Sequence, residues 1–136
     1  MMKKINHIGI AVHSIEEAAA FYCDCLGLKL TEVIDIPARQ IRAALLETPN
    51  GCLELIEPWE ENEAVRNFLS RRGEGIHHIA FQVKDIDGTV KIMKAQGVIF
   101  VTESPVIGAH GRRIIFISPK STHGVLIELC ESADSK

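Results

Sequence analysis

Two stretches of this chain repeat one another. With an offset of 71 residues, residues 6–15, NHIGIAVHSI, lie over residues 77–86, HHIAFQVKDI. The offset places His7 over His78, and in both copies the next residues carry apolar side chains at helical spacing. Farther along, Leu53-Glu54-Leu55 lies over Ile127-Glu128-Leu129 with an offset of 74. A repeat that keeps histidine with histidine and glutamate with glutamate predicts a fold built from two similar units.

Each repeat is expected to form a strand, a helix and three further strands, which is a βαβββ unit. The helices end near Gly27 and Gly97, because glycine readily adopts the left-handed conformation at a helix end. The later strands are expected at Lys29–Asp35, Ile41–Glu47 and Gly51–Glu57 in the first repeat, and at Ile99–Glu103, Arg112–Ile117 and Val125–Cys130 in the second. We expect one domain, residues 1–136, with repeat one at about 4–58, a connector helix at about 60–73, and repeat two at about 75–131.

Four polar residues stand at equivalent positions of the repeats: His7 and Glu54 in the first, His78 and Glu128 in the second. Both glutamates lie among apolar residues, where an unpartnered carboxylate is costly to bury. Two units related by a pseudo-two-fold axis would bring all four side chains together. Two imidazoles and two carboxylates suit one divalent ion such as zinc, cobalt, nickel, manganese or iron(II). We therefore expect an α+β fold in which the tandem units form a curved, partly closed mixed sheet around a metal site.

The remaining histidines fit this site less well. His77 neighbours His78 on a strand, so its side chain points to the opposite face. His13, His110 and His123 are expected in loops, where solvation is the simpler interpretation, although His110 lies in a glycine-flanked turn that could contact a ligand.

Composition excludes several classes of function. A net charge of −3 argues against general binding of nucleic acid or of a membrane surface. The sequence contains neither a signal peptide nor an apolar stretch of membrane length, so we expect a cytoplasmic protein. None of the four cysteines forms a C-x-x-C pair, which favours buried, reduced thiols over a zinc-thiolate site.

Several segments together resemble the vicinal oxygen chelate superfamily, also called the glyoxalase/bleomycin-resistance fold, and within it the methylmalonyl-CoA epimerases. The segments are Asn6-His7-Ile8-Gly9-Ile10-Ala11-Val12, Gly73-Glu74-Gly75-Ile76-His77-His78-Ile79, Gly108-Ala109-His110-Gly111, and Pro119-Lys120-Ser121-Thr122 followed by Gly124 to Leu129. The first is common to many members, whereas the last three in combination are more specific for the epimerases.

The resemblance implies a metal-dependent isomerase, usually dimeric, that acts on an acyl-CoA. Its metal ligands fall on His7, Glu54, His78 and Glu128, the residues already selected from the repeat. Glu54 and Glu128 are also the expected acid/base residues. One departure concerns Ala43, which replaces an additional glutamate that some epimerases carry before the Glu54 strand.

Contacts to the CoA phosphates need cations and hydrogen-bond donors. Residues in or beside the motif loops could supply them, namely Arg112, Lys120, Ser121 and His110. Solvated surface charges are an equally good interpretation of Arg112 and Lys120.

Two other functions are compatible with this fold. Glyoxalase I, the lactoylglutathione lyase, uses the same four ligand types, so only the loop motifs favour an epimerase over it. A non-catalytic small-molecule-binding protein of the antibiotic-resistance type would generally lack the ligands, all four of which this chain has.

Overall fold

The computed structural model describes residues 2–133, and the chain divides into two compact units. The N-terminal unit comprises residues 7–77, and the C-terminal unit combines the chain from residue 78 onward with the first residues of the first strand, up to residue 6.

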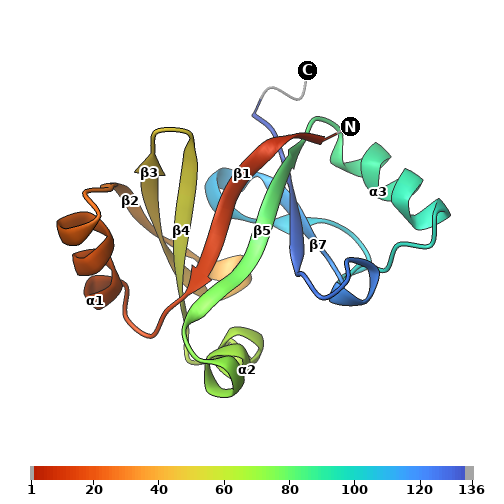
Figure 1. Cartoon of the computed structure of the whole chain (residues 1–136). Helices are drawn as coiled ribbons and strands as arrows, with labels where there is room; N and C mark the ends of the chain where they lie inside the picture. Colours follow the sequence, from red (N-terminus) through yellow and green to blue (C-terminus); the bar gives the residue numbers. More distant parts are fainter. Residues whose placement is uncertain (1, 134–136) are drawn as a thin grey trace. The chain divides into compact units, whose positions relative to one another are not determined.

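The N-terminal unit is a four-stranded mixed sheet with helices before and after its later strands (Figure 1). Its elements are β1 (Met2–Ala11), α1 (Ile15–Ala19), the π-helix η1 (Ala20–Cys25), β2 (Lys29–Ile36), the 3-10 turn η2 (Pro37–Arg39), β3 (Ile41–Thr48), β4 (Gly51–Pro58) and α2 (Glu63–Arg72). The strand order is β2-β3-β4-β1. β1 and β4 are parallel, whereas the other neighbours are antiparallel.

The C-terminal unit repeats this topology with shorter strands. Its elements are β5 (Gly75–Val83), α3 (Ile86–Ala95), β6 (Val106–Ile107), η3 (Ala109–Gly111), β7 (Arg113–Ile117), η4 (Pro119–Ser121) and β8 (Ile127–Glu131). The strand order is β5-β8-β7-β6, and the first and last strands of the repeat, β5 and β8, are again parallel. The expected α+β class and the duplicated βαβββ order are therefore confirmed.

Each unit packs its helix against one face of its own sheet. In the N-terminal unit Ile10, Leu46 and Leu55 form a buried cluster with Ile15 at the start of α1. In the C-terminal unit Val83, Ile115 and Leu129 do the same with Ile86 and Val90 of α3. Since strand side chains alternate, the opposite face of each sheet carries His7 and Glu54 in one unit, and His78 and Glu128 in the other.

The same polar contacts start the helix in both repeats. Glu57 Oε1 accepts a hydrogen bond from the Ile15 amide at 2.9 Å, and the equivalent Glu131 Oε2 accepts one from the Ile86 amide at 3.5 Å. A carboxylate is favourable here because the first amides of a helix have no partner within the helix. Glu57 consequently points away from the face that carries Glu54, as strand alternation predicts.

An arginine on the third strand of each repeat completes this arrangement. Arg42 pairs with Glu16 at 3.0 Å, and Arg113, which is 71 residues later, pairs with Asp87 at 2.8 Å. Arg113 also contacts Glu131 at 3.1 Å. These exposed pairs link the first helical turn to the sheet in each unit.

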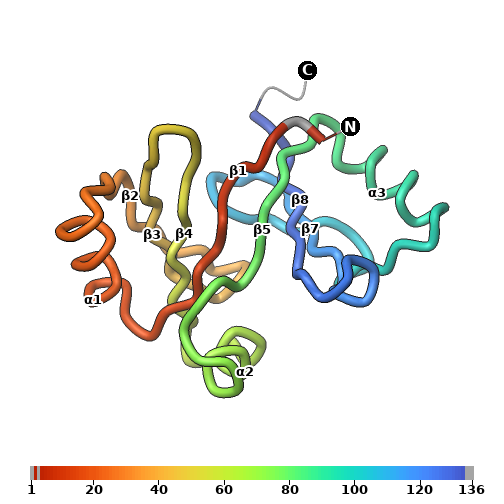
Figure 2. Tube along the Cα trace, in the orientation of Figure 1, coloured from red at the N-terminus to blue at the C-terminus, as the bar shows by residue number. Residues whose placement is uncertain are grey.

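Two expectations about the strands are wrong. Residues 99–103 do not form a strand, because only Phe100 makes a bridge, to Ile117, before the chain bends at residues 101–104. Figure 2 lets the reader follow the chain from α3 to β7. The last strand begins at Ile127 rather than Val125, since the turn at His123 and Gly124 has positive φ. The first helix does extend to Cys25 as expected, although its hydrogen bonding changes from α-helical to π-helical after Ala19.

The cysteines also differ from expectation. Cys130 is buried, Cys23 and Cys52 are half-buried, and Cys25 is exposed. All four are free thiols. Within the described residues no helix has the length and apolar character needed to cross a membrane.

Candidate metal centre

The first half of the expected site lies on β1 and β4. These strands are parallel neighbours in which Gly9 stands opposite Glu54, so His7, two residues before Gly9, shares the face of Glu54. His7 Nε2 lies 3.6 Å from Glu54 Oε1. The two residues are 9% and 2% exposed, so water screens this pair poorly.

The second half lies on β5 and β8 and follows the same rule. Ala80 stands opposite Glu128, and His78 shares that face two residues earlier. His78 Nε2 lies 3.2 Å from Glu128 Oε1, and both residues are 1% exposed. The ring of Phe116, on the neighbouring strand β7, meets the His78 ring edge to face at 5.4 Å between centroids. Phe116 stands opposite Glu128 in the β7–β8 register and covers this pair with apolar surface.

The chemistry of these pairs suits a divalent ion. His7, Glu54 and His78 are buried residues that each offer one ligand atom of the type that binds zinc and similar metals. A buried carboxylate needs a compensating positive charge, and an imidazole beside it can act as a second ligand to one ion. Each unit therefore holds one histidine and one carboxylate of the kind that the expected metal site requires.

An arginine that sequence reasoning missed lies beside the first pair. Arg39 Nη1 is 3.9 Å from Glu54 Oε1, and the Arg39 side chain is only 10% exposed. Its repeat-equivalent residue, 71 positions later, is His110, which had been singled out for its loop. The repeat therefore offered a signal for Arg39, although the histidine alone was selected.

The other expected ligand contacts have different surroundings. Arg112 and Lys120 are exposed, as is His110, whose φ of 58° is left-handed. Ser121 has a structural role, since its Oγ accepts a hydrogen bond from the Ile99 amide at 2.8 Å. A phosphate contact from Ser121 would therefore have to share this hydroxyl.

The orientation expected for His77 is confirmed, and the structure shows where Ala43 lies. His77 packs its ring against Phe68 of α2, with centroids 5.0 Å apart, rather than on the face of His78. Ala43 is fully buried on β3 opposite Ile56, the face that Glu54 shares. The side chain at position 43, on the face of Glu54, is therefore a methyl group that cannot act as a base.

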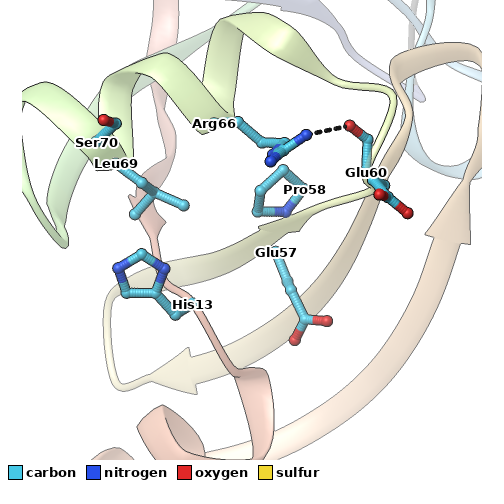
Figure 3. Close-up of a pocket in the computed structure, with 7 residues that line it drawn as sticks. All are labelled: His13, Glu57, Pro58, Glu60, Arg66, Leu69 and Ser70. Atoms are coloured by element: carbon cyan, nitrogen blue, oxygen red, sulfur yellow. Dashed lines mark hydrogen bonds between the residues drawn. The ribbon is translucent and has the colours of Figure 1, made fainter.

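A cavity of about 540 Å³ opens on the N-terminal unit, away from the candidate ligands. Figure 3 shows Arg66 and Leu69 of α2 on one side of it, with His13 and Glu57 facing them. Arg66 donates to the Glu60 carbonyl at 2.8 Å. Because Glu57 lies on the sheet face opposite Glu54, this cavity belongs to the helix side of the unit.

The candidate site affects the pKa of one nearby thiol, that of Cys52. Burial raises the pKa of Cys52, and the nearby negative charge of Glu54 raises this pKa further. Cys52 is therefore protonated near neutral pH and is a weak nucleophile.

Comparison with known proteins identifies related sequences and structures. A model of the glyoxalase/bleomycin resistance protein/dioxygenase superfamily matches residues 6–116. The chain is 39% identical over 130 residues to YqjC of Bacillus subtilis, an uncharacterised protein, and the match covers 96% of this chain and 93% of YqjC. It is 35% identical over 127 residues to the human mitochondrial methylmalonyl-CoA epimerase, covering 93% of this chain and 72% of that protein.

A solved structure also resembles the whole chain. It is a single-residue variant of Streptomyces coelicolor methylmalonyl-CoA epimerase in complex with 2-nitronate-propionyl-CoA. The TM-score is 0.89 at 37% identity, and the match covers 98% of this chain and 99% of the other.

Proposed function

Because the chain belongs to the glyoxalase/bleomycin resistance protein/dioxygenase superfamily, we propose that it is a metal-dependent epimerase of methylmalonyl-CoA. The observation that carries this proposal is the pair of buried His–Glu contacts at equivalent positions of two repeats. The relatives named as methylmalonyl-CoA epimerases support the choice of substrate, since they match nearly the whole length of this chain. The human relative is longer than the matched region, so its activity is carried over only as a proposal.

In this proposal His7, Glu54, His78 and Glu128 jointly hold one divalent ion. The two carboxylates would offset the charge of such an ion, and two neutral imidazoles would complete its ligands. This would account for the burial of a glutamate at the equivalent position of each repeat. When bound, the ion supplies Lewis-acid stabilisation of the negative charge that develops on the thioester oxygen.

Epimerisation requires that a proton leave one face of the α-carbon and return to the other. Carboxylates from two equivalent positions can flank such a carbon, so Glu54 and Glu128 are proposed as the two acid/base residues. One takes the α-proton and generates the enolate, and the other delivers a proton to the opposite face. Ala43 strengthens this assignment, because the chain has no glutamate there to act as a separate base.

The CoA portion brings phosphates that need positive charge. Arg112, Lys120 and His110 are exposed and lie in the loops around η3 and η4, so they remain proposed contacts. Glyoxalase I is the second candidate, because His–Glu pairs of this kind suit both reactions. The similarity to several epimerases along nearly the whole chain favours the epimerase.

Conversion of one purified epimer of methylmalonyl-CoA into the other by metal-loaded protein tests the proposal. The hemithioacetal of methylglyoxal and glutathione serves as the competing substrate. Turnover of the hemithioacetal alone would replace the proposal with glyoxalase I, and turnover of neither would refute both.

A further inference from the structure

Phe116 is a large apolar side chain beside one of the two histidine–glutamate pairs. It lies on β7 directly opposite Glu128 of β8, and Ala80 of β5 stands opposite Glu128 on the other side. Residues directly opposite one another in a sheet share a face, so these three side chains form one row across three strands. His78 lies on the same face, two residues before Ala80. The row therefore places an aromatic ring next to both members of the pair.

The ring of Phe116 bears directly on the direction of the His78 side chain. The centroids of the two rings are 5.4 Å apart, and their planes are nearly perpendicular, at 87°. This separation and angle are those of a favourable edge-to-face aromatic pair. Rotation of an imidazole about its last side-chain torsion is otherwise soft, because that torsion has no narrow staggered minima. The contact thus restricts the torsion that directs His78 Nε2 toward Glu128 Oε1, 3.2 Å away.

The surroundings of Phe116 hold its ring in turn. It packs against a buried cluster on the same sheet face, formed by Ala80, Ile114 and Cys130. Close-packed neighbours of this kind limit how far a side chain can move. Phe116 can therefore transmit the rigidity of the sheet to the histidine beside it.

The first repeat lacks an aromatic ring at the equivalent position. Leu45, which the offset of 71 residues places under Phe116, stands opposite Glu54. The histidine–glutamate distance is 3.6 Å in that repeat and 3.2 Å beside the phenylalanine. The pair beside Phe116 is also the more deeply buried of the two. The repeats thus differ at the residue that flanks the ligand pair, and the two pairs differ in closeness.

We propose that Phe116 is a positioning residue that holds His78 in the orientation needed to bind the metal ion together with Glu128. The inference deepens the proposed function and rests on it, since it takes His78 and Glu128 as ligands. An imidazole that is fixed in advance loses less rotational freedom when it binds an ion. Removal of the ring should consequently weaken metal binding and change the arrangement of the ligands, although every ligand atom is kept.

Binding of Co²⁺ to the purified chain tests this role without relying on turnover. Phe116→Leu gives the second repeat the residue that the first repeat has, so an apolar side chain remains and the ring is lost. Its affinity for Co²⁺, measured by competition with a chelator, should fall about 3- to 10-fold, the size expected for loss of one aromatic pair. The visible absorption of bound Co²⁺ reports its coordination geometry and should shift as well.

Two further variants separate the ring from the bulk of the side chain. Phe116→Tyr keeps the ring and should bind Co²⁺ with the affinity and spectrum of the wild type. Phe116→Ile removes the ring with a residue that suits a strand, so it should match Phe116→Leu and replaces that variant if it unfolds.

Phe81→Leu is the matched control. Phe81 lies next to Ala80 on β5, but its side chain packs on the other sheet face, against the cluster that contains Leu129 and the α3 residues. Loss of the ring from that face should lower stability in urea while the affinity for Co²⁺ and the spectrum stay unchanged.

Wild-type affinity and spectrum in the ring-free variants of Phe116 would overturn the inference. An equal loss of affinity in Phe81→Leu, or in Phe116→Tyr, would also overturn it. A wild type that binds Co²⁺ but does not epimerise methylmalonyl-CoA would refute the proposed function alone, because a ring-dependent affinity would still uphold the role of Phe116. Absence of Co²⁺ binding by the wild type would refute both.

Discussion

His78 Nε2 lies 3.2 Å from Glu128 Oε1, and the two residues that make this contact are each only 1% exposed. The first repeat contains the same contact between His7 and Glu54, at 3.6 Å. Burying a carboxylate is costly unless a positive charge or hydrogen-bond donors compensate it. This cost arises twice, at equivalent positions of the two repeats. The following predictions derive from the proposal that both pairs bind one metal ion.

Removal of one imidazole should release the metal. His78→Ala should weaken binding of the divalent ion by more than about 100-fold, because loss of a direct ligand exceeds the 10- to 100-fold effect of losing an outer partner. Equilibrium dialysis with metal analysis measures this affinity. The adjacent His77→Ala is the control, since His77 packs on Phe68 instead. Equal metal binding by the His78 and His77 variants would contradict the assigned ligands.

Replacement of Glu54 by glutamine should separate metal binding from catalysis. The amide oxygen of Glu54→Gln remains a possible ligand, but it is no base, so metal should stay bound while epimerisation falls at least about 100-fold. Exchange of the α-proton of one epimer with solvent should persist, because Glu128 still serves one face. Chiral analysis of the product and deuterium incorporation measure the two steps separately. Full turnover with metal bound would show that Glu54 is not one of two bases.

Asn62 should contribute more to stability than an ordinary helix cap. It accepts the Val65 amide and also donates to the turn that carries Arg39, so Asn62→Ala should lower the free energy of unfolding by about 2 kcal/mol. Urea unfolding measures the change. Ser14→Ala removes a cap with one hydrogen bond, from the Glu17 amide at 3.2 Å, and should cost about 1 kcal/mol or less. Equal losses in the two variants would mean that the bonds to the turn contribute nothing.

Cys52 should make the protein less stable in alkaline solution. Burial, and then the charge of Glu54, raise the pKa of this thiol above its ordinary value of 9.0. The folded state therefore holds the proton more tightly than the unfolded state. The resulting stabilisation is complete below the unfolded pKa and is lost as pH rises through the folded pKa. Denaturant midpoints measured across this range should fall less steeply for Cys52→Ser than for the wild type. Cys25→Ser, at an exposed thiol, should follow the wild type, and identical profiles for all three proteins would contradict the prediction.

Much of each unit could be predicted because the repeat and strand alternation act together. They located β3 and β4 to within one residue and placed His7 on the same face as Glu54, since a period of two leaves no freedom about which face a side chain occupies. Ile99 and Val101 misled the strand assignment, because apolar alternation there does not correspond to a ladder and both side chains are exposed. The repeat relates Arg39 to His110, but the strand face that a turn residue meets depends on the backbone of the turn, so the contact of Arg39 with Glu54 is seen only in three dimensions.

Proton exchange by NMR tests the central claim most directly. Metal-loaded protein is mixed with methylmalonyl-CoA in deuterium oxide, with chelator-treated protein and the His78→Ala variant in parallel. The account predicts rapid loss of the α-proton signal with the metal-loaded wild type, and slow loss in both controls. Retention of the α-proton by metal-loaded wild-type protein, or equally rapid loss after chelation, would contradict the proposal that this chain is a metal-dependent epimerase.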